Sequence, residues 1–327
     1  MTQMMKAIIY TEFGPPDVLQ LKEVEKPIPK ENEVLIKNYA ASVAVEDPDM
    51  RQSPGLNGLR TPKNPILGMY LAGEIETVGK NVKRFKVGDQ VYGSTGLGNG
   101  AYAEYKCLPE KAALAIMPVN LNYQEAAAIP NGGLTALPFL RDQGNIQAGG
   151  EVLVNGASGA VGTAAVQLAL YFGTKVTGVC STSNIELVKS LGASQVIDYT
   201  REDFTRTSQT YDIIFDTVGK SSFSRCRDSL KQGGVYLTTV PTLEIIPHLL
   251  NPFSIRRKSA KFSATGLRPS RAQARDLASL TQIIEEGKFQ AVIDKCYSLK
   301  DTAEAHRYVE KGHKKGNVVI TVEHDEN

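Results

Sequence analysis

Apolar and polar positions change their spacing near residue 120, which divides the chain into two kinds of region. Before that point, short apolar runs such as KAIIY, VLQLKEV and EVLIKNYA are separated by Gly and Pro, a pattern that predicts β-strands joined by turns. After it, apolar runs of strand length alternate with helical patterns. The sequence therefore predicts a β-rich domain followed by an α/β domain.

The clearest single unit covers residues 151–172. The apolar run 152–154 predicts a buried strand, and the small residues at 156–160 predict a tight turn. Beyond the turn, apolar residues return at helical spacing and mark one face of a helix. They are Val161, Ala164, Ala165, Leu168, Ala169 and Phe172. A helix that starts directly after such a turn directs free N–H groups and a positive dipole end towards it, which favours an anion.

Small residues in this turn match a phosphate-binding pattern. Gly159 and Gly162 occupy the second and third glycine positions of G-x-G-x-x-G, and Ala157 takes the first. The second glycine lets the backbone approach a pyrophosphate, and the third lets helix and strand pack closely. With the strand before and the helix after, the turn predicts a dinucleotide-binding Rossmann unit. Its expected pyrophosphate contacts are Ala157, Ser158, Gly159, Ala160, Val161 and Gly162.

Alternation of strands and helices continues to about residue 267. Apolar runs predict strands at 175–180, 195–199, 211–218, 233–240 and 261–267. The helices between them are expected to stop at Gly173, Gly192 and Gly233, because glycine adopts the left-handed conformation that ends a helix. With the strand near residue 153 this gives a doubly wound parallel sheet of about six strands, the full size of a dinucleotide-binding domain.

Two further segments flank this predicted sheet. In the first, a helical pattern after residue 121 is expected to break at Pro130 and Gly132-Gly133. In the second, a helix at 270–286 precedes late strands at 291–299 and 317–322. Because those strands lie beyond a completed sheet, we assign them to the first domain.

The nucleotide-binding domain is then an insertion in a β-rich catalytic domain, and the fold class is α/β. We expect a catalytic domain at 1–122 with a return segment at 268–327, and a Rossmann domain at 123–267. An active site is expected in the cleft between the two.

Composition narrows the kind of partner. With 327 residues, 42% hydrophobic residues and a net charge of +2, the chain resembles a globular protein of two domains and lacks a basic field for nucleic acid. No apolar run is long enough to span a bilayer, and the first residues show no signal-peptide pattern.

The four cysteines are far apart and form no C-x-x-C pair, which suits a reducing compartment, so we expect a cytoplasmic protein.

Several motifs in order along nearly the whole chain resemble one family. They are FGPPDVL (13–19), LGMYLAGEIETVG (67–79), KVGDQVYG (86–93), GAYAEY (100–105), AAAIPNGGLTA (126–136), NGASGAVG (155–162) and the terminal KGNVVITV. The chain is similar to the zinc-independent, zeta-crystallin-like quinone oxidoreductases of the medium-chain dehydrogenase/reductase superfamily. This resemblance implies a GroES-like catalytic domain, NADPH-dependent hydride transfer to a quinone or an α,β-unsaturated carbonyl compound, and a homodimer.

The residue types predict a site without metal. All four histidines lie in the last third of the chain, so a zinc site within the first 150 residues would have only Cys107 and carboxylates. Zinc-dependent relatives carry G-H-E, and here Met69 and Tyr70 stand in the His and Glu positions. No metal would then polarise a carbonyl. Hydride addition to an enone or a quinone is easier, because the acceptor itself delocalises the charge.

The end of the second predicted strand indicates the cofactor. An NAD-specific fold places Asp or Glu there, about 20 residues beyond the glycine turn. This chain instead has Ser181, Ser183 and Asn184, which can donate hydrogen bonds to a 2′-phosphate. The resemblance implies that Tyr199 closes over this phosphate. Relatives often carry Arg or Lys at or next to Ser183 and Asn184, and the basic run at 256–258 is a candidate for the missing charge. We expect NADPH.

The resemblance also implies residues around the nicotinamide. Thr135, in the family's G-x-T-A segment, is expected to face it, together with the backbone of Thr238, Thr239 and Val240. Asn317, in KGNVVITV, is expected among the cofactor contacts. The protein would contribute mainly orientation and exclusion of water.

Two positions depart from the family pattern. Ala44 stands where an asparagine is common, and Tyr70 stands where an aspartate is common. Tyr70 is a candidate proton donor for the enolate, although its apolar run favours packing. Two other functions stay open: reduction of 2-enoyl thioesters, and non-catalytic NADPH binding as in crystallins.

Overall fold

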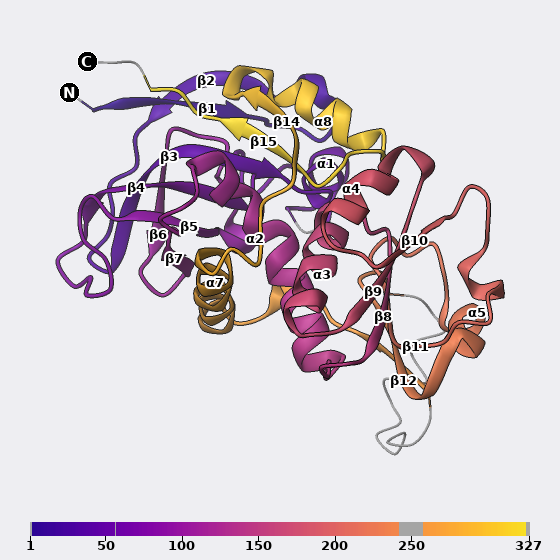
Figure 1. Ribbon diagram of the computed structural model, residues 1–327. Coiled ribbons are helices and arrows are strands. Elements are labelled where there is room, and N and C mark those ends of the chain that lie inside the picture. Colours follow the sequence, from indigo (N-terminus) through magenta and orange to yellow (C-terminus); the bar gives the residue numbers. More distant parts are fainter. Residues whose placement is uncertain (1, 56, 242–257, 325–327) are drawn as a thin grey trace. The chain divides into compact units, whose positions relative to one another are not determined.

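The computed structural model describes residues 2–55, 57–241 and 258–324 (Figure 1). They form two compact units, Met1–Asn131 with Arg268–Asn327 and Gly132–Leu267. The expected boundary after residue 122 lies at the start of helix α2 (Tyr123–Pro138), and the units divide within this helix.

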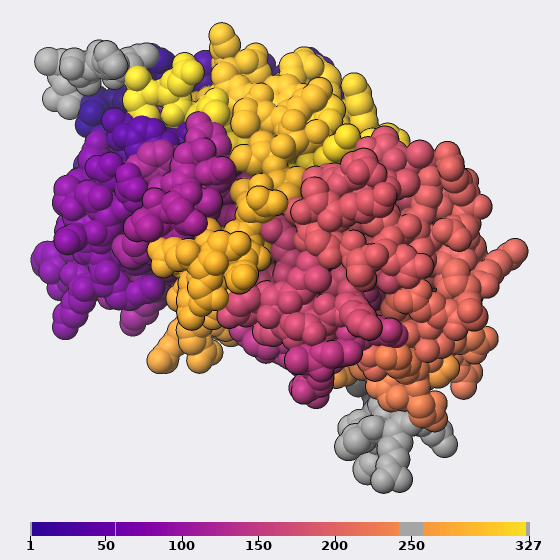
Figure 2. Space-filling view, viewed as in Figure 1, coloured from indigo at the N-terminus to yellow at the C-terminus, as the bar shows by residue number. Residues whose placement is uncertain are grey.

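A seven-stranded sheet of the first unit combines segments from both ends of the sequence. Its order is β14-β15-β3-β4-β5-β7, with β6 also paired to β3. The strands are β3 (Glu33–Val43), β4 (Tyr70–Val78), β5 (Gln90–Ser94), β6 (Tyr105–Pro109), β7 (Ala113–Ile116), β14 (Ile293–Ser298) and β15 (Asn317–Thr321). Val318 of β15 lies opposite Val43 of β3, so the late strands join the early ones. In Figure 2 the yellow C-terminal residues accordingly lie beside the indigo N-terminal ones.

Smaller elements complete this unit. They are the hairpin of β1 (Met4–Ile9) and β2 (Gln20–Glu25) and the helices α1 (Glu46–Gln52), α7 (Ser270–Glu285) and α8 (Thr302–Glu310). The core is apolar and includes Ile36 of β3, Leu71 of β4 and Ile320 of β15, all fully buried. This burial is the main stabilising contribution.

The second unit has a six-stranded sheet of order β10-β9-β8-β11-β12-β13, in which every neighbouring pair is parallel. Its strands are β8 (Glu151–Asn155), β9 (Lys175–Cys180), β10 (Gln195–Asp198), β11 (Tyr211–Asp216), β12 (Leu230–Thr238) and β13 (Ser259–Phe262). Helices α3 (Ala160–Tyr171), α4 (Ile185–Ser190) and α5 (Phe223–Cys226) connect them. The predicted fold class is confirmed.

The expected break between residues 121 and 141 is wrong, because α2 continues through Pro130 and both glycines. Packing explains this result. A Cβ on Gly132 would lie 2.3 Å from the Ala160 carbonyl oxygen and 3.1 Å from the Ala164 Cβ, so the glycine permits close approach to α3. Tertiary contact here overrides the low helix propensity of proline and glycine.

No helix of the described residues has the length and apolarity needed to cross a membrane.

Two of the three expected helix stops are confirmed. Gly173 and Gly192 directly follow helical segments and have φ values of 77° and 99°, a conformation that favours glycine. Gly233 also has a positive φ, of 82°, but it lies inside β12, where the strand starts three residues earlier than the apolar pattern indicated. A register shift against β11 accommodates it.

Candidate functional site

The turn between β8 and α3 provides backbone donors at the carboxyl edge of the parallel sheet. Gly159 is the N-cap residue of α3, and the Thr163 amide donates to its carbonyl at 2.8 Å. The helix therefore offers no acceptor to the N–H groups of Ala160, Val161 and Gly162. Three such donors at a helix N-terminus fit a pyrophosphate.

The turn glycines differ in the space around them. A Cβ on Gly162 would lie 2.0 Å from the Gly156 carbonyl oxygen, so this residue must be glycine for the helix to pack on the turn. A Cβ on Gly159 would meet only the Gly156 carbonyl oxygen, at 3.7 Å. The space beside Gly159 is therefore open and can receive a pyrophosphate. Ala157 is fully buried, and Gly178 of β9 gives it room, since a Cβ there would be 3.1 Å from that of Ala157.

A polar network connects this turn with the end of β9. The Asn184 side-chain amide donates to Ser158 Oγ at 3.0 Å and to Ser181 Oγ at 3.2 Å, and Ser181 and Ser183 Oγ atoms are 3.3 Å apart. The structure thus brings Ser158, expected at the pyrophosphate, together with the three residues expected at the 2′-phosphate. Tyr199 lies next to them, because its amide donates to the Cys180 carbonyl at 3.1 Å.

A buried carboxylate that the sequence did not single out organises the neighbouring loops. Asp216, at the end of β11, is fully buried. Its oxygens accept from Asn155 Nδ2, the amides of Val218, Gly219 and Ser221, and the Tyr236 hydroxyl. An aspartate that ends an apolar strand was the available signal, but two of its five donors, Asn155 and Tyr236, are distant in sequence.

The residues expected near the nicotinamide also lie at this edge. The Thr239 amide donates to the Asp216 carbonyl at 3.3 Å, and the Val240 amide donates to Thr238 Oγ1 at 3.1 Å. Thr135 Oγ1 accepts from Thr265 Oγ1 at 3.4 Å, and Thr265 follows β13. In a parallel sheet, residues that follow neighbouring strands lie at one edge, which is where α/β proteins bind ligands.

Of the basic run at 256–258, the structure places only Lys258. Arg256 and Arg257 lie outside the described residues. Lys258 precedes β13 and donates to the Arg227 carbonyl at 2.7 Å. Because β13 is parallel to its neighbour, Lys258 lies at the amino edge, opposite the serines that follow β9.

Tyr70 and Asn317 belong to the first unit. Tyr70 begins β4, opposite Ser42 of β3 and Ser94 of β5, and is half-buried. Burial and the charges of Glu46 and Asp47 raise its pKa far above the ordinary tyrosine value. Asn317 is buried at the start of β15, where it accepts from Asn131 Nδ2 at 3.1 Å.

Asp47 links the segments that surround Tyr70. Its Oδ2 accepts from the Tyr102 hydroxyl at 2.6 Å and from the Ala44 amide at 2.9 Å. Burial raises the pKa of Asp47 to about 7, whereas hydrogen bonds from Tyr102, Ala44 and the Gly68 backbone oppose this rise. This carboxylate links helix α1 to the segments 67–79 and 100–105, and its only signal in the sequence is an aspartate in a polar helix start.

Among the residues that the structure describes, no group of three or more His, Cys, Asp or Glu side chains is placed to hold a metal ion. Met69 directly precedes β4 and Tyr70 begins it, at the two positions that the resemblance assigns to His and Glu in zinc-dependent relatives. The fold, the turn before α3 and its polar network define a dinucleotide-binding protein. Its Rossmann unit is inserted in the sequence of the first unit, whose sheet is mainly antiparallel.

Comparisons with known proteins agree with this class. A family profile described as an alcohol dehydrogenase GroES-like domain matches residues 30–118, and one described as zinc-binding dehydrogenase matches residues 191–320. A 2-methylene-furan-3-one reductase of Solanum lycopersicum is 35% identical, over 97% of this chain and 79% of that protein. The chloroplastic NADPH-dependent alkenal/one oxidoreductase of Arabidopsis thaliana is 31% identical over the same shares.

Among solved structures, the quinone oxidoreductase from Coxiella burnetii superposes with a TM-score of 0.83 at 31% identity, covering 98% of this chain and all of that one. The chain belongs to the zeta-crystallin-like quinone oxidoreductase family of the medium-chain dehydrogenase/reductase superfamily. It is an oxidoreductase of a family that binds nicotinamide dinucleotides.

Proposed function

We propose that this enzyme reduces the conjugated double bond of an enone or enal, or a quinone, with NADPH and without a metal ion. The observation that carries this proposal is the turn before α3, where three helix amides have no acceptor in the helix and the space at Gly159 is open. The relatives include an alkenal/one oxidoreductase and a 2-methylene-furan-3-one reductase, which supports the substrate class.

Each group of residues has a distinct part in this proposal. The amides of Ala160, Val161 and Gly162 bind the pyrophosphate. Ser181, Ser183, Asn184 and Tyr199 bind the phosphorylated adenosine ribose. Thr135, Asn317 and the backbone at 238–240 orient the nicotinamide ring. When bound, the reduced cofactor supplies a hydride, and the protein contributes positioning.

Tyr70 is proposed as a hydrogen-bond donor to the substrate carbonyl. Because its pKa is raised, the phenol stays protonated over the physiological pH range. Such a group stabilises negative charge that develops on the oxygen as hydride adds to the β-carbon. The same raised pKa makes it a poor source of a proton, so we assign the proton that reaches the α-carbon to solvent.

Three finer points are part of the proposal. The absence of His and Glu in the G-M-Y segment supports metal independence, and the hydrogen-bonding side chains after β9 support NADPH over NADH. Homodimer formation rests on family membership. A cytoplasmic location is supported by the four free cysteines, which suit a reducing compartment.

The direct test is NADPH oxidation with a panel of quinones, enones and 2-enoyl thioesters, with and without a chelator, beside light scattering for the dimer. We expect turnover of enones or quinones that chelation leaves unchanged. Turnover confined to thioesters would favour the first alternative function, and tight NADPH binding without turnover would favour a non-catalytic protein.

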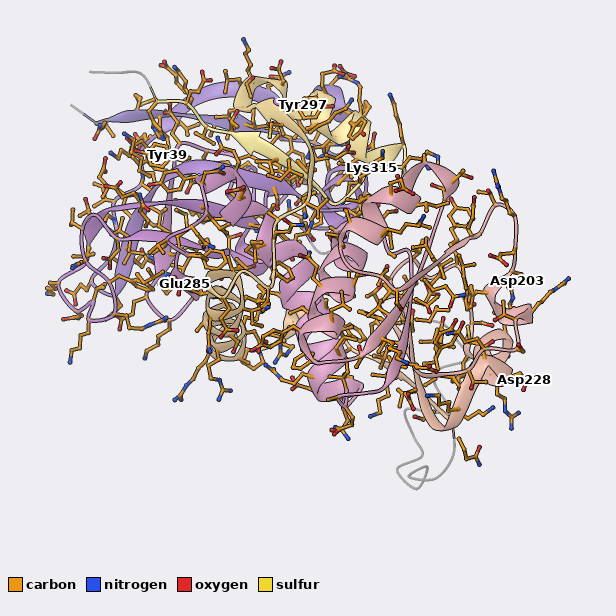
Figure 3. The ribbon with its side chains drawn as sticks, viewed as in Figure 1. Tyr39, Asp203, Asp228, Glu285, Tyr297 and Lys315 are labelled. Carbon is orange, nitrogen blue, oxygen red and sulfur yellow. The ribbon has the colours of Figure 1, made fainter. Side chains whose placement is uncertain are left out.

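Variants test the two assigned side chains. Thr135→Val and Tyr70→Phe should each lower kcat by about 10- to 100-fold, because each removes one positioned polar contact. Tyr297→Phe, on β14 and labelled in Figure 3, is the matched control and should keep the parent rate. If neither Thr135→Val nor Tyr70→Phe changes turnover of any accepted substrate, the assignment of both residues is wrong.

A further inference from the structure

We propose that Arg201 is the cation that recognises the 2′-phosphate of NADPH and so determines the choice between NADPH and NADH. This inference rests on the proposed function. The polar groups after β9 are all neutral: Ser181, Ser183 and Asn184 provide hydroxyl and amide donors but no positive charge. A phosphate monoester carries close to two negative charges, and charge-assisted bonds hold it much better than neutral ones.

Strand register brings Arg201 to the correct edge. β9 and β10 are parallel neighbours, with Cys180 opposite Asp198 at their carboxyl ends. The segments that follow them, residues 181–184 and 199–201, therefore leave the sheet side by side. The bond from the Tyr199 amide to the Cys180 carbonyl, at 3.1 Å, holds the second segment against the first.

Asp198 connects the arginine to the serine-containing turn. Its Oδ2 accepts from Thr182 Oγ1, a residue of that turn, and lies 3.5 Å from Arg201 Nε. The Asp198 side chain is almost buried, whereas 75% of the Arg201 side chain is exposed. The Asp198 carboxylate thus contacts one edge of the guanidinium and restricts its orientation. The contact involves Nε, and the guanidinium has two further nitrogens that can bind a phosphate in a forked geometry.

The negative charge of Asp198 need not repel the phosphate, because it is paired with Arg201. Bonds from Thr182 and Thr200 lower the pKa of Asp198, which keeps it ionised and paired with Arg201. The pair has no net charge, and a guanidinium with five N–H groups can contact both anions. NADH has no 2′-phosphate, so it gains nothing from Arg201.

A second arginine nearby provides a matched control. Arg206 contacts Asp203 at 3.8 Å with the same sequence separation of three, and its side chain is 87% exposed. Asp203, labelled in Figure 3, also binds Arg225 and lies beyond the segment that follows β10. Arg206→Gln therefore removes an equivalent exposed charge from the same unit without touching the turn at 181–184.

The experiment measures the affinities of full-length protein for 2′,5′-ADP and 5′-AMP, which differ only in the 2′-phosphate, by calorimetry at two salt concentrations. We expect the parent to prefer 2′,5′-ADP. Arg201→Gln should reduce that preference by about 10- to 100-fold and weaken its salt dependence, Arg201→Lys should have an intermediate preference, and Arg206→Gln should keep the parent ratio.

The possible outcomes separate the inference from the proposed function. A parent that binds neither nucleotide would contradict the proposed function itself. A parent that prefers 2′,5′-ADP while Arg201→Gln keeps the same preference would overturn the role of Arg201 alone. A parent without any preference would also overturn it, and would leave a reductase that uses NADH.

Discussion

Two buried carboxylates, Asp47 in the first unit and Asp216 in the second, meet the cost of burial in different ways. Both side chains are fully buried. Asp216 accepts hydrogen bonds from five donors. Asp47 has fewer donors, namely the Tyr102 hydroxyl and the backbone of Ala44 and Gly68. Burial correspondingly raises the pKa of Asp47 to about 7.

The difference shows that the number of donors, and not burial alone, decides how a carboxylate can act. Asp216 fixes the loops at the carboxyl edge of the Rossmann sheet, including the Asn155 end of β8. Asp47 holds the backbone near Tyr70 with fewer bonds and can take up a proton near neutral pH. The five bonds of Asp216 support the surrounding loops, and the raised pKa of Asp47 makes its contribution to stability depend on pH.

The largest expected effect comes from Asp216→Asn. An amide group would direct N–H donors at several existing donors, so we expect a loss of about 3–5 kcal/mol in the free energy of unfolding. Asp47→Asn should cost about 1 kcal/mol or less at pH 7, because the native group is already half protonated. Chemical denaturation of both variants measures the comparison, and equal losses would refute the distinction between the two sites.

The next effect is the pH dependence of stability. The folded-state pKa of Asp47, about 7, exceeds the ordinary value, so its contribution is greatest below about pH 4 and is lost as the pH rises to 7. His306 has the opposite sign: burial and the neighbouring Arg51 lower its pKa to about 3, so its contribution is lost as the pH falls below 6.5. Between about pH 4 and 6.5 the two oppose each other.

Asp47→Asn removes one side of this balance. The unfolding free energy of the variant, relative to the parent, should therefore rise by roughly 1 kcal/mol per pH unit from pH 4 to 6.5. Denaturation curves at several pH values test this slope. A difference that does not change with pH would mean that Asp47 is ionised throughout.

The smallest effects come from the neighbours of Asp47. Tyr102→Phe removes a hydrogen bond that lowers the pKa of Asp47, and Glu46→Gln removes a charge that raises it. The first variant should move the pH dependence of stability upward and the second should move it downward, each by about one pH unit or less. Shifts in the same direction would show that these neighbours do not act through Asp47.

Local patterns predicted the part of the site that is local in sequence. The turn from Ala157 to Gly162, the strand before it and the helix after it follow from apolar periodicity and small residues. The serines after β9 followed from their distance to that turn. The continuous α2 was missed, because the contact of Gly132 with α3 is not visible in the spacing of residues.

The same limit applies to the charged groups. Asp216 draws on donors up to 61 positions away, and Asp47 binds Tyr102, 55 positions away. Arg201 is connected to the turn through Asp198 and Thr182. These arrangements depend on strand order and register, which a single sequence does not specify.

The most direct test of the central claim is an NADPH titration of the parent beside Gly159→Ala and Gly162→Ala. Gly159 has an ordinary backbone conformation and open space, so its alanine variant should fold with an unchanged melting temperature but bind NADPH about 10- to 100-fold more weakly. Gly162→Ala should lose stability as well, because its Cβ would overlap the Gly156 carbonyl. NADPH affinity in Gly159→Ala equal to that of the parent would show that the cofactor does not lie on this turn.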